Sequence, residues 1–436
     1  MQRRIMAAIG RAILPLVVLT SCGTVSSTAW RYSRIYEPAN SIRHLSVTVC
    51  GLDVLVNDRF APLQGKSVAV LTNQTGLDRE GNHILDIIHR QAGIELKAIF
   101  SPEHGLSGTA SAGEKVADSE DTRTHVKVYS LYGETRKPTP EQLAGIDVLL
   151  FYSQDAGARY YTKPSTLTLV MEACAQQNIP VWVLDRPNPV RGDIVEGPIL
   201  DTAYASFVGM HPVPIRHGLT LGELAVMINE MGWLSDSLHA DLTVVPVLNW
   251  KRHLWWDETG LDWVPSSPNI PTPETALAYL GTCLFEGTNV SEGRGTREPF
   301  LVCGAPWIKQ GLADRLNAYD LPGVLFEDIV YTPRSIQGAA HPKFQDQACG
   351  GVRLLITDPV SFVPINTGVV MVHTIREHYP HQFQWQHPRH LDRLWGSDEL
   401  RRFIDDECDI RTHVATYALD RDLFFDQRKA YLIYGD

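Results

Sequence analysis

Residues 146–161, IDVLLFYSQDAGARYY, contain the most apolar run of the chain. The run is only a few residues long, and the polar group Ser153-Gln154-Asp155 follows it directly. A short apolar run that ends in turn residues is typical of a strand buried on both faces, as in a parallel sheet covered by helices. The neighbouring sequence repeats this order of elements.

Further short apolar runs lie at residues 65–76 (GKSVAVLTNQTG), 95–105 (ELKAIFSPEHG), 124–133 (THVKVYSLYG) and 180–190 (PVWVLDRPNPV). Between them, helices are expected at residues 83–93, from Thr139-Pro140-Glu141 onward, and at residues 165–175. Strands that alternate with amphipathic helices predict an α/β fold, here a Rossmann-like doubly wound parallel sheet over about residues 51–248.

Each polar cluster follows a predicted strand instead of preceding it. The clusters are Asn73-Gln74-Thr75, Ser101-Pro102-Glu103-His104, Ser153-Gln154-Asp155 and Asp185-Arg186-Pro187-Asn188. In open parallel sheets, ligands bind outside the carboxyl ends of the strands. We therefore expect these side chains to gather along one edge of the sheet.

Absent motifs narrow the chemistry of that edge. The sequence has no GxxxxGK[ST], GxGxxG, HExxH or GxSxG, so nucleotide, zinc-hydrolase and nucleophile-elbow sites are not indicated, and no cofactor or metal is expected. A formal net charge of -11 disfavours nucleic acid as a partner. The carboxylates, amides, arginines and aromatic residues that remain are typical of a carbohydrate site.

The first 22 residues, MQRRIMAAIGRAILPLVVLTSC, have the basic start and apolar centre of an export signal and are too short to span a membrane. Leu19-Thr20-Ser21-Cys22 resembles a bacterial lipobox, so Cys22 is expected to carry lipid, and residues 23–50 to form a tether. Gly23 leaves an outer-membrane, periplasmic location open. The alternative is ordinary secretion after cleavage at a nearby small residue. The six other cysteines are widely and irregularly spaced, which predicts mostly buried thiols.

A second polar region follows a proline-rich linker and a helix expected near Thr275. Its glycine-rich loop carries Glu286, Asn289, Glu292, Arg294 and Arg297. Glu292 is the natural second carboxylate, and Arg294 or Arg297 could bind an anionic substituent. The alternative is a structural loop with salt bridges.

Two domains are expected from the length of the chain, one at residues 51–265 and a smaller α+β domain at residues 266–436 that forms the other wall of a cleft. In the second, helices are expected at residues 309–321, 364–380 and 390–406, and a strand at residues 351–358.

Glu103 is the first candidate for catalysis. It leaves a buried strand between Pro102 and Gly105, where it could act as a general acid, and His104 could bind substrate or tune that acid. The alternative is that Glu103 caps a turn and His104 faces water. Similarly, Asp155 and Arg159 could form a structural ion pair. Tyr160 and Tyr161 could stack on sugar, although core packing is the commoner use of such residues.

The strings FSPEHGLSG, QDAGARYYT, LDRPNP with EGP, HGLTLGELA, SPNIPTP and FEGTNVSEGRGTREPF occur in this order over roughly residues 55–305. As a group they resemble the peptidoglycan exo-β-N-acetylmuramidase family, long catalogued as a domain of unknown function. The resemblance implies a Rossmann-like domain, an auxiliary domain and an active cleft between them. It also implies release of N-acetylmuramic acid from the non-reducing ends of peptidoglycan fragments without a nucleotide cofactor, with Glu103 as the acid. Ala156, where valine is more usual, and Ser153, where the family often has an acid, depart from the pattern, and the second departure weakens a catalytic role for Asp155.

Glycoside hydrolysis usually needs one carboxylic acid and a second carboxylate, and Glu103 and Glu292 are predicted to be this catalytic pair. Retaining, inverting and substrate-assisted routes stay open. Muramic acid carries a lactyl carboxylate, so an arginine among Arg159, Arg186 and Arg294 is expected to face it. The predicted substrate-binding residues are Asn73, His104, Asp155, Arg159, Tyr160, Asp185, Arg186, Asn188, His217, Asn289 and Arg294. The competing hypothesis is a peptidoglycan-binding lipoprotein without turnover, and an esterase or amidase is a more distant third.

Overall fold

The computed structural model describes residues 30–38, 47–406, 410 and 418–435. The predicted export signal, Cys22 and most of the predicted tether lie outside these residues. From Arg31 onward the described residues belong to one compact unit.

The larger sheet has eight strands in the order β1-β10-β7-β6-β2-β3-β5-β4. All neighbours are parallel except β4, which runs antiparallel to β5. The strands are β1 (Ser33–Ile35), β2 (Ser67–Thr72), β3 (Glu95–Ser101), β4 (Ser119–Glu120), β5 (Lys127–Ser130), β6 (Val148–Tyr152), β7 (Val181–Leu184) and β10 (Leu242–Val245). The six strands β5-β3-β2-β6-β7-β10 have the order of a doubly wound Rossmann sheet, so the predicted fold class is confirmed.

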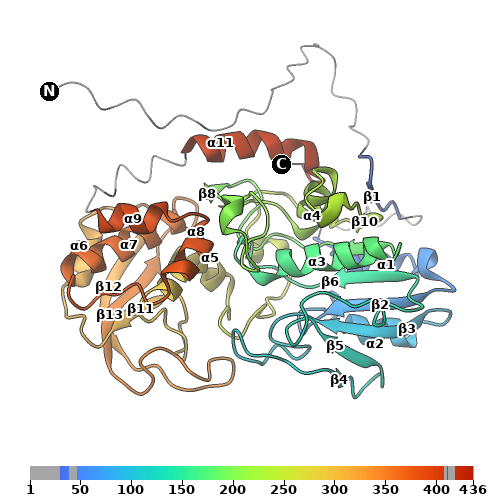
Figure 1. Ribbon diagram of the computed structural model, residues 1–436, viewed down its shortest axis with the longest axis horizontal. Helices are drawn as coiled ribbons and strands as arrows, with labels where there is room; N and C mark the ends of the chain where they lie inside the picture. Colours follow the sequence, from blue (N-terminus) through green and yellow to red (C-terminus); the bar gives the residue numbers. More distant parts are fainter. Residues whose placement is uncertain (1–29, 39–46, 407–409, 411–417, 436) are drawn as a thin grey trace, which may run out of the picture. The chain divides into compact units, whose positions relative to one another are not determined.

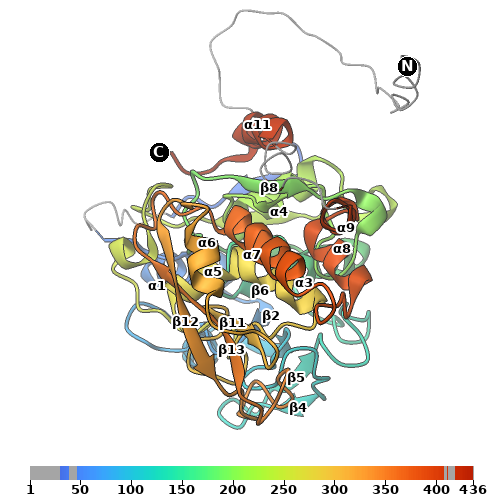
Figure 2. The same cartoon turned by 90° about the vertical axis from the view of Figure 1, so that its left-hand side faces the viewer.

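Helices cover both faces of this sheet because its central strands are apolar on both sides. All five residues of β6 are buried. The helices are α1 (Gly51–Asn57), α2 (Ile84–Arg90), α3 (Thr162–Gln176) and α4 (Leu221–Glu230). One apolar cluster joins α1 and α2 to the strands, and α3 lies on the opposite side of β6 from α1 (Figure 2). The first turn of α4 is fixed by a capping box between Thr220 and Glu223.

The second half of the chain contains a three-stranded antiparallel sheet in the order β11-β13-β12. Its strands are β11 (Val302–Ala305), β12 (Val324–Tyr331) and β13 (Cys349–Ile356). Earlier in the chain, β8 (Glu196–Ile199) and β9 (Pro214–Arg216) form a separate two-stranded pair. The helices of the second half are α5 (Pro273–Thr282), α6 (Leu312–Asn317), α7 (Pro364–His378), α8 (Pro388–Trp395) and α9 (Glu399–Asp405). Figure 1 shows this half beside the larger sheet, with α11 (Ala418–Gln427) returning toward α4 and β8. The predicted α+β character of residues 266–436 agrees with these elements.

Four expectations about individual elements need correction. Residues 140–145 form turns instead of a helix, because Gly145 at φ 70° ends the segment. The helix expected at residues 390–406 is two helices, since Gly396 at φ 98° interrupts it. Of residues 309–321, only Leu312–Asn317 are helical. Ser33–Ile35, placed in the tether, form the edge strand β1 through pairing with β10.

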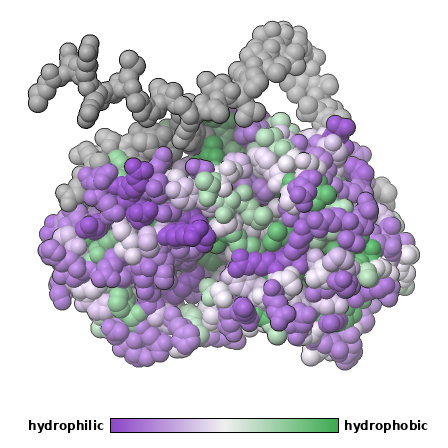
Figure 3. Space-filling view, in the orientation of Figure 1, coloured by the Kyte–Doolittle hydropathy of each residue, from purple (hydrophilic) through white to green (hydrophobic). Residues whose placement is uncertain are grey.

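One apolar core cluster includes residues from Ala156 to Ile410 and so crosses position 265. The predicted domain boundary at that position stays a prediction. The five cysteines of the described residues, Cys50, Cys174, Cys283, Cys303 and Cys349, are free and buried, as expected from their spacing. The face of the molecule in Figure 3 is mostly hydrophilic, with paler and more hydrophobic residues gathered toward its middle.

Candidate active site

A cavity of about 360 Å³ lies where the loops after β3 and β5 meet α5 and the loop that follows it. Its charged and polar lining comes from Glu103, His104, Tyr132, Thr162, Ser267, Glu286, Arg294 and His390. Tyr160, Tyr161, Tyr279 and Phe300 supply aromatic surface. A wider groove of about 1020 Å³ is lined by Gln74, Ser107 and Gln337 among others, and His104 lines both spaces. Residues from both halves of the chain therefore line one cavity.

Glu103 is held at the wall of this cavity by the turn that ends β3. His104 (φ 71°) and Gly105 (φ 74°) both adopt the left-handed backbone conformation, which lets the chain reverse directly after the glutamate. Glu103 Oε1 accepts a hydrogen bond from Gly113 N at 3.0 Å, and Oε2 accepts one from Thr162 Oγ1 at 2.8 Å. Thr162 is the first residue of α3, so the positive end of a 15-residue helix faces this carboxylate.

Glu286 is the second carboxylate of the cavity, and its surroundings keep it ionised. Burial alone would raise its pKa, but the Arg294 guanidinium and hydrogen bonds from His390 and Arg294 outweigh burial and lower the pKa to about 2. The Glu286 Oε1 to Arg294 Nη2 distance is 2.7 Å, and the Oε2 to His390 Nε2 distance is 3.2 Å. A carboxylate with this environment serves as an anion and not as a proton donor at neutral pH.

Glu292, the carboxylate that the sequence analysis chose as the partner of Glu103, is turned away from the cavity. Its side chain is 6% exposed and forms ion pairs with Arg294 Nε at 3.3 Å and Lys343 Nζ at 3.0 Å. Gly293 (φ 80°) and the Phe300 N to Glu292 O hydrogen bond close the loop in this orientation. Glu286, and not Glu292, is therefore the second carboxylate that lines the cavity, and Glu292 is held in ion pairs.

Four of the predicted site residues meet at the cavity: Glu103, His104, Tyr160 and Arg294. His104 is anchored by a 2.7 Å contact between its Nδ1 and Ala110 O. The Tyr160 ring is fixed by a hydrogen bond from its hydroxyl to Leu280 O at 2.7 Å and by edge-to-face packing on Tyr279. Of the three arginines expected to face a lactyl carboxylate, Arg294 lines the cavity, and its contact with that group stays a prediction.

The other predicted ligand residues are engaged in the protein itself and do not line the cavity. Arg159 is 2% exposed and donates to the backbone carbonyls of Pro198, Val213, Leu394 and Trp395. It therefore ties the first half of the chain to α8 instead of pairing with Asp155. These four hydrogen bonds from Nη1 and Nη2 give Arg159 a role in holding the segments together, while its buried Nε has no hydrogen-bond partner in the structure.

The switch point of the Rossmann sheet, between β2 and β6, is closed by the chain's own hydrogen bonds. Asn73 Oδ1 accepts from Ser153 Oγ at 3.1 Å and from Thr75 Oγ1 at 2.6 Å. Next to it, Arg186 Nε donates to Gln154 Oε1 at 2.7 Å. Side chains after these strands do meet at one edge, as predicted, but they join the loops to one another.

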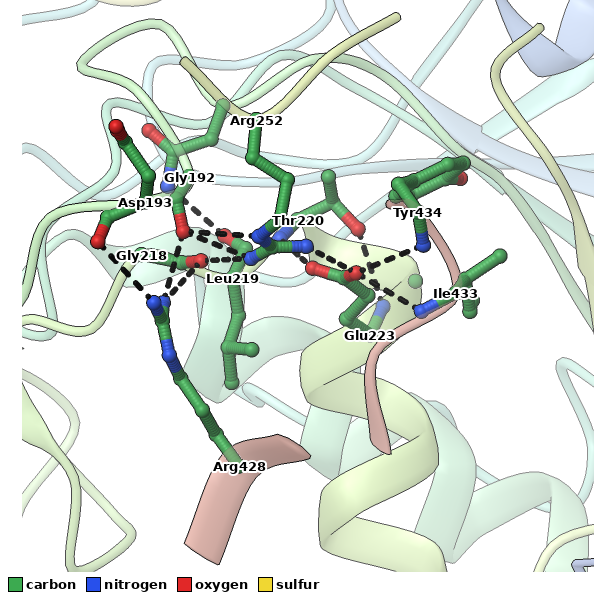
Figure 4. Close-up of polar contacts among 12 residues, drawn as sticks. Gly192, Asp193, Gly218, Leu219, Thr220, Glu223, Arg252, Arg428, Ile433 and Tyr434 are labelled. Carbon is green, nitrogen blue, oxygen red and sulfur yellow. Dashed lines mark hydrogen bonds and ion pairs between the residues drawn. The ribbon is translucent and has the colours of Figure 1, made fainter. Parts of the chain in front are cut away.

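The end of β7 is covered by the C-terminal segment. Asp185 Oδ2 accepts from Thr220 Oγ1 and Tyr434 Oη, both at 2.6 Å. Figure 4 shows the neighbouring contacts, in which Arg428 donates to Gly192 O and Gly218 O and the backbone of Ile433 donates to Glu223.

Three further predicted ligand residues are also occupied within the protein. Asn188 donates to Leu219 O. His217 is 0% exposed, and burial lowers its pKa to about 3. Asn289 donates to Gln382 O and accepts from Gln384 N, which fixes the loop before α8.

Tyr132, Thr162, Glu286 and His390 line the cavity but were not among the predicted site residues. Glu286 stands in the same glycine-rich loop as Arg294, so the predicted loop does supply part of the cavity lining. The catalytic role predicted for Glu292 stays a prediction. Thr162 adjoins the QDAGARYYT string. Nothing in the sequence near His390 indicates a site.

Within the described residues, no group of three or more His, Cys, Asp or Glu side chains could hold a metal ion. In the same part of the chain, no helix combines the length and apolar character needed to cross a membrane.

Comparison with known proteins gives a consistent result over almost the whole chain. Family models described as exo-β-N-acetylmuramidase NamZ, N-terminal and C-terminal, match residues 68–274 and 277–434. The chain is 43% identical over 385 residues to peptidoglycan β-N-acetylmuramidase NamZ of Bacillus subtilis (strain 168), covering 88% of this chain and 91% of that protein. Crystal structures of two DUF1343 family proteins from Bacteroides fragilis NCTC 9343 superpose with TM-scores of 0.82 and 0.74 at 34% and 33% identity. Both matches cover 89% of this chain. The first covers 100% of the crystallised chain and the second covers 99%.

Proposed function

The chain belongs to the NamZ exo-β-N-acetylmuramidase family, and from this premise we propose that it is a glycosidase that removes N-acetylmuramic acid from the non-reducing ends of peptidoglycan fragments. The observation that carries the proposal is the cavity with two carboxylates in contrasting environments. Glu103 accepts hydrogen bonds from two neutral donors, Gly113 N in the loop after β3 and Thr162 Oγ1 at the start of α3, whereas Glu286 is paired with Arg294. Pairs of titratable groups in such different surroundings are characteristic of acid and anion roles.

The size and lining of the cavity suit one sugar residue. Its volume of about 360 Å³ is at the lower end of ligand sites, which run from roughly 300 to 1,000 Å³. Tyr160, Tyr161 and Phe300 provide aromatic surface for a pyranose ring. A space that takes a single terminal sugar is what an exo-acting enzyme requires, and the adjoining groove leaves room for the rest of the glycan.

In the proposed reaction, Glu103 protonates the oxygen of the leaving sugar while Glu286 stabilises the positive charge that develops at the anomeric carbon. His390 and Arg294 keep Glu286 in place for this role. The groups on the substrate that distinguish muramic acid, the lactyl carboxylate among them, would face Arg294.

The test is release of N-acetylmuramic acid from the disaccharide MurNAc-GlcNAc by the purified protein, followed by chromatography. We expect Glu103→Gln to lose activity by at least about 10²-fold while the fold is kept. Glu134→Gln, at an exposed position in the loop after β5 that lines neither the cavity nor the groove, is the control and should retain full activity. Binding of the disaccharide without any release by the wild-type protein would instead favour a peptidoglycan-binding protein, and an active Glu103→Gln variant would exclude Glu103 as the acid.

We further propose that the protein acts in cell-wall turnover at the periplasmic face of a membrane, held there by lipid on Cys22. The support is the lipobox-like Leu19-Thr20-Ser21-Cys22 at the end of an export signal. Metabolic labelling with a palmitate analogue tests this, with Cys22→Ala as the control. A wild-type protein that takes up no label would remove the anchor from the proposal.

A further inference from the structure

Lys163 is a buried cation in the first turn of α3, next to Thr162, which lines the cavity. It is the second residue of α3, directly after the Thr162 that binds Glu103, and it is 1% exposed. Its Nζ atom has no hydrogen-bond partner in the structure. Burial of an ammonium group without a hydrogen bond is costly, so a lysine in this position calls for a reason beyond packing.

The charges of two carboxylates from different loops act on this amine. Burial lowers the pKa of Lys163 to about 8, and the charges of Glu103 and Asp155 limit that decrease. The amine is therefore protonated at neutral pH. Asp155 Oδ1 is likewise buried without a hydrogen-bond partner, so these groups act on one another through charge and not through a closed, hydrogen-bonded ion pair.

Three titratable groups near Glu103, the side chains of His104, Tyr132 and Tyr161, carry no charge at neutral pH. Burial lowers the pKa of His104 and raises the pKa of Tyr132 to about 12 and that of Tyr161 further still. Arg294 is already balanced by Glu286 and Glu292. Lys163 thus supplies a positive charge that acts on Glu103 and that forms no hydrogen bond within the described residues.

We propose that Lys163 is a positioning residue for Glu103, whose ammonium group stabilises the carboxylate that Glu103 becomes during each catalytic cycle. This inference rests on the proposed function. The proton of Glu103 passes to the glycosidic oxygen as the bond from that oxygen to the anomeric carbon breaks. Water supplies the hydroxyl group of the released sugar, and the remaining proton of that water restores the acid. An ammonium group fixed beside the carboxylate lowers the barrier to the first transfer.

The experiment compares Lys163→Met and Lys163→Arg with the wild-type protein in the pH dependence of kcat/KM on MurNAc-GlcNAc. We expect Lys163→Met to lower kcat by at least about tenfold and to move the alkaline limb of the profile to higher pH. The direction follows because Glu103 gives up its proton less readily beside a neutral side chain. Lys163→Arg keeps the charge and should keep the limb in place. The control is Lys137→Met. Lys137 pairs with Glu172, which lies in the same helix as Lys163, and its replacement should leave the pH profile unchanged.

An alkaline limb that stays in place in a folded Lys163→Met protein overturns the proposal, as does an equal shift in Lys163→Arg. If Lys163→Met does not fold, Asp155→Asn tests the same charge balance with the opposite sign. Removing the negative charge beside Lys163 should move the alkaline limb to lower pH, and an unmoved limb contradicts the proposal. A wild-type protein that releases no sugar refutes the proposed function itself, which is a separate outcome.

Discussion

Thr162 Oγ1 donates a 2.8 Å hydrogen bond to Glu103 Oε2 and so joins the first turn of α3 to the loop after β3. The two residues are 59 positions apart in sequence, and both are buried. This contact fixes the carboxylate beside the N-terminus of α3.

Thr162→Val removes the hydroxyl donor with little change in shape. A hydrogen bond to a charged group contributes roughly 1.5 to 3 kcal/mol, so we expect kcat on MurNAc-GlcNAc to fall about 10- to 100-fold. Thr162→Ser keeps the donor and should recover most of the activity. Steady-state kinetics of the three proteins check this, and equal activity of the valine and serine variants would show that the hydroxyl is not used.

Glu286 and Glu292 share Arg294 but are expected to respond differently to substitution. Glu286→Gln removes the anion that faces the cavity, so kcat should fall by about 10²-fold. Glu292→Gln removes the buried counter-charge of Lys343, so it should mainly destabilise the fold, by roughly 3 kcal/mol. Kinetics and urea unfolding of both variants separate these effects. Equal losses of kcat would contradict the assignment of Glu286 to the cavity.

Much of the fold could be predicted because strand and helix signals are local. Apolar runs such as the one at residues 146–152 define buried strands, and their alternation with helices defines the parallel sheet. The helix expected at residues 390–406 failed because the positive φ of Gly396 depends on the contacts of its neighbours, including the Asp201 N to Gly396 O hydrogen bond. A single sequence does not show such a long-range contact.

The site was predicted less well than the fold for a related reason. Sequence identifies which loops follow strands, but it does not tell which side chain of a polar loop faces a cavity and which forms an internal ion pair. Glu103 was correctly placed at the cavity, whereas Glu292 and Asp185 proved to be bound by other residues of the chain. The partner of Asp185, Tyr434, is 249 positions away.

Tyr434 attaches the C-terminal segment to the end of β7. Tyr434→Phe leaves the buried Asp185 with one hydrogen-bond donor fewer, so we expect a loss of roughly 1 to 3 kcal/mol in the free energy of unfolding. Tyr431→Phe, on the more exposed part of the same segment, is the matched control and should change stability by less than about 0.5 kcal/mol. Denaturant unfolding measures both, and equal stability of the two variants would argue against the anchoring role.

Asp155 provides a pH-dependent test of the buried charges near the cavity. Burial raises its pKa from 3.8 to about 7. Hydrogen bonds from the backbone N–H groups of Gly157 and Ala156 and the charge of Lys163 lower the pKa, but by less than burial raises it. The native protein therefore binds more protons than the unfolded chain between these two values, so this group makes the protein less stable as the pH rises through that window. Asp155→Asn removes this titration. The free energy of unfolding of the variant, relative to that of the wild-type protein, should therefore increase between about pH 4 and about pH 8. The increase should reach up to roughly 4 kcal/mol, because each pKa unit corresponds to about 1.4 kcal/mol.

The measurement for Asp155 is urea unfolding of both proteins at several pH values across that window. Asp236→Asn, at an exposed position, is the control and should follow the wild-type protein at each pH. A stability difference between Asp155→Asn and wild type that is the same at low and high pH would mean that Asp155 does not hold its proton in the native state. In that case Asp155 would already be an anion beside Lys163 under acidic conditions, and the charge balance around Glu103 would have to be drawn differently.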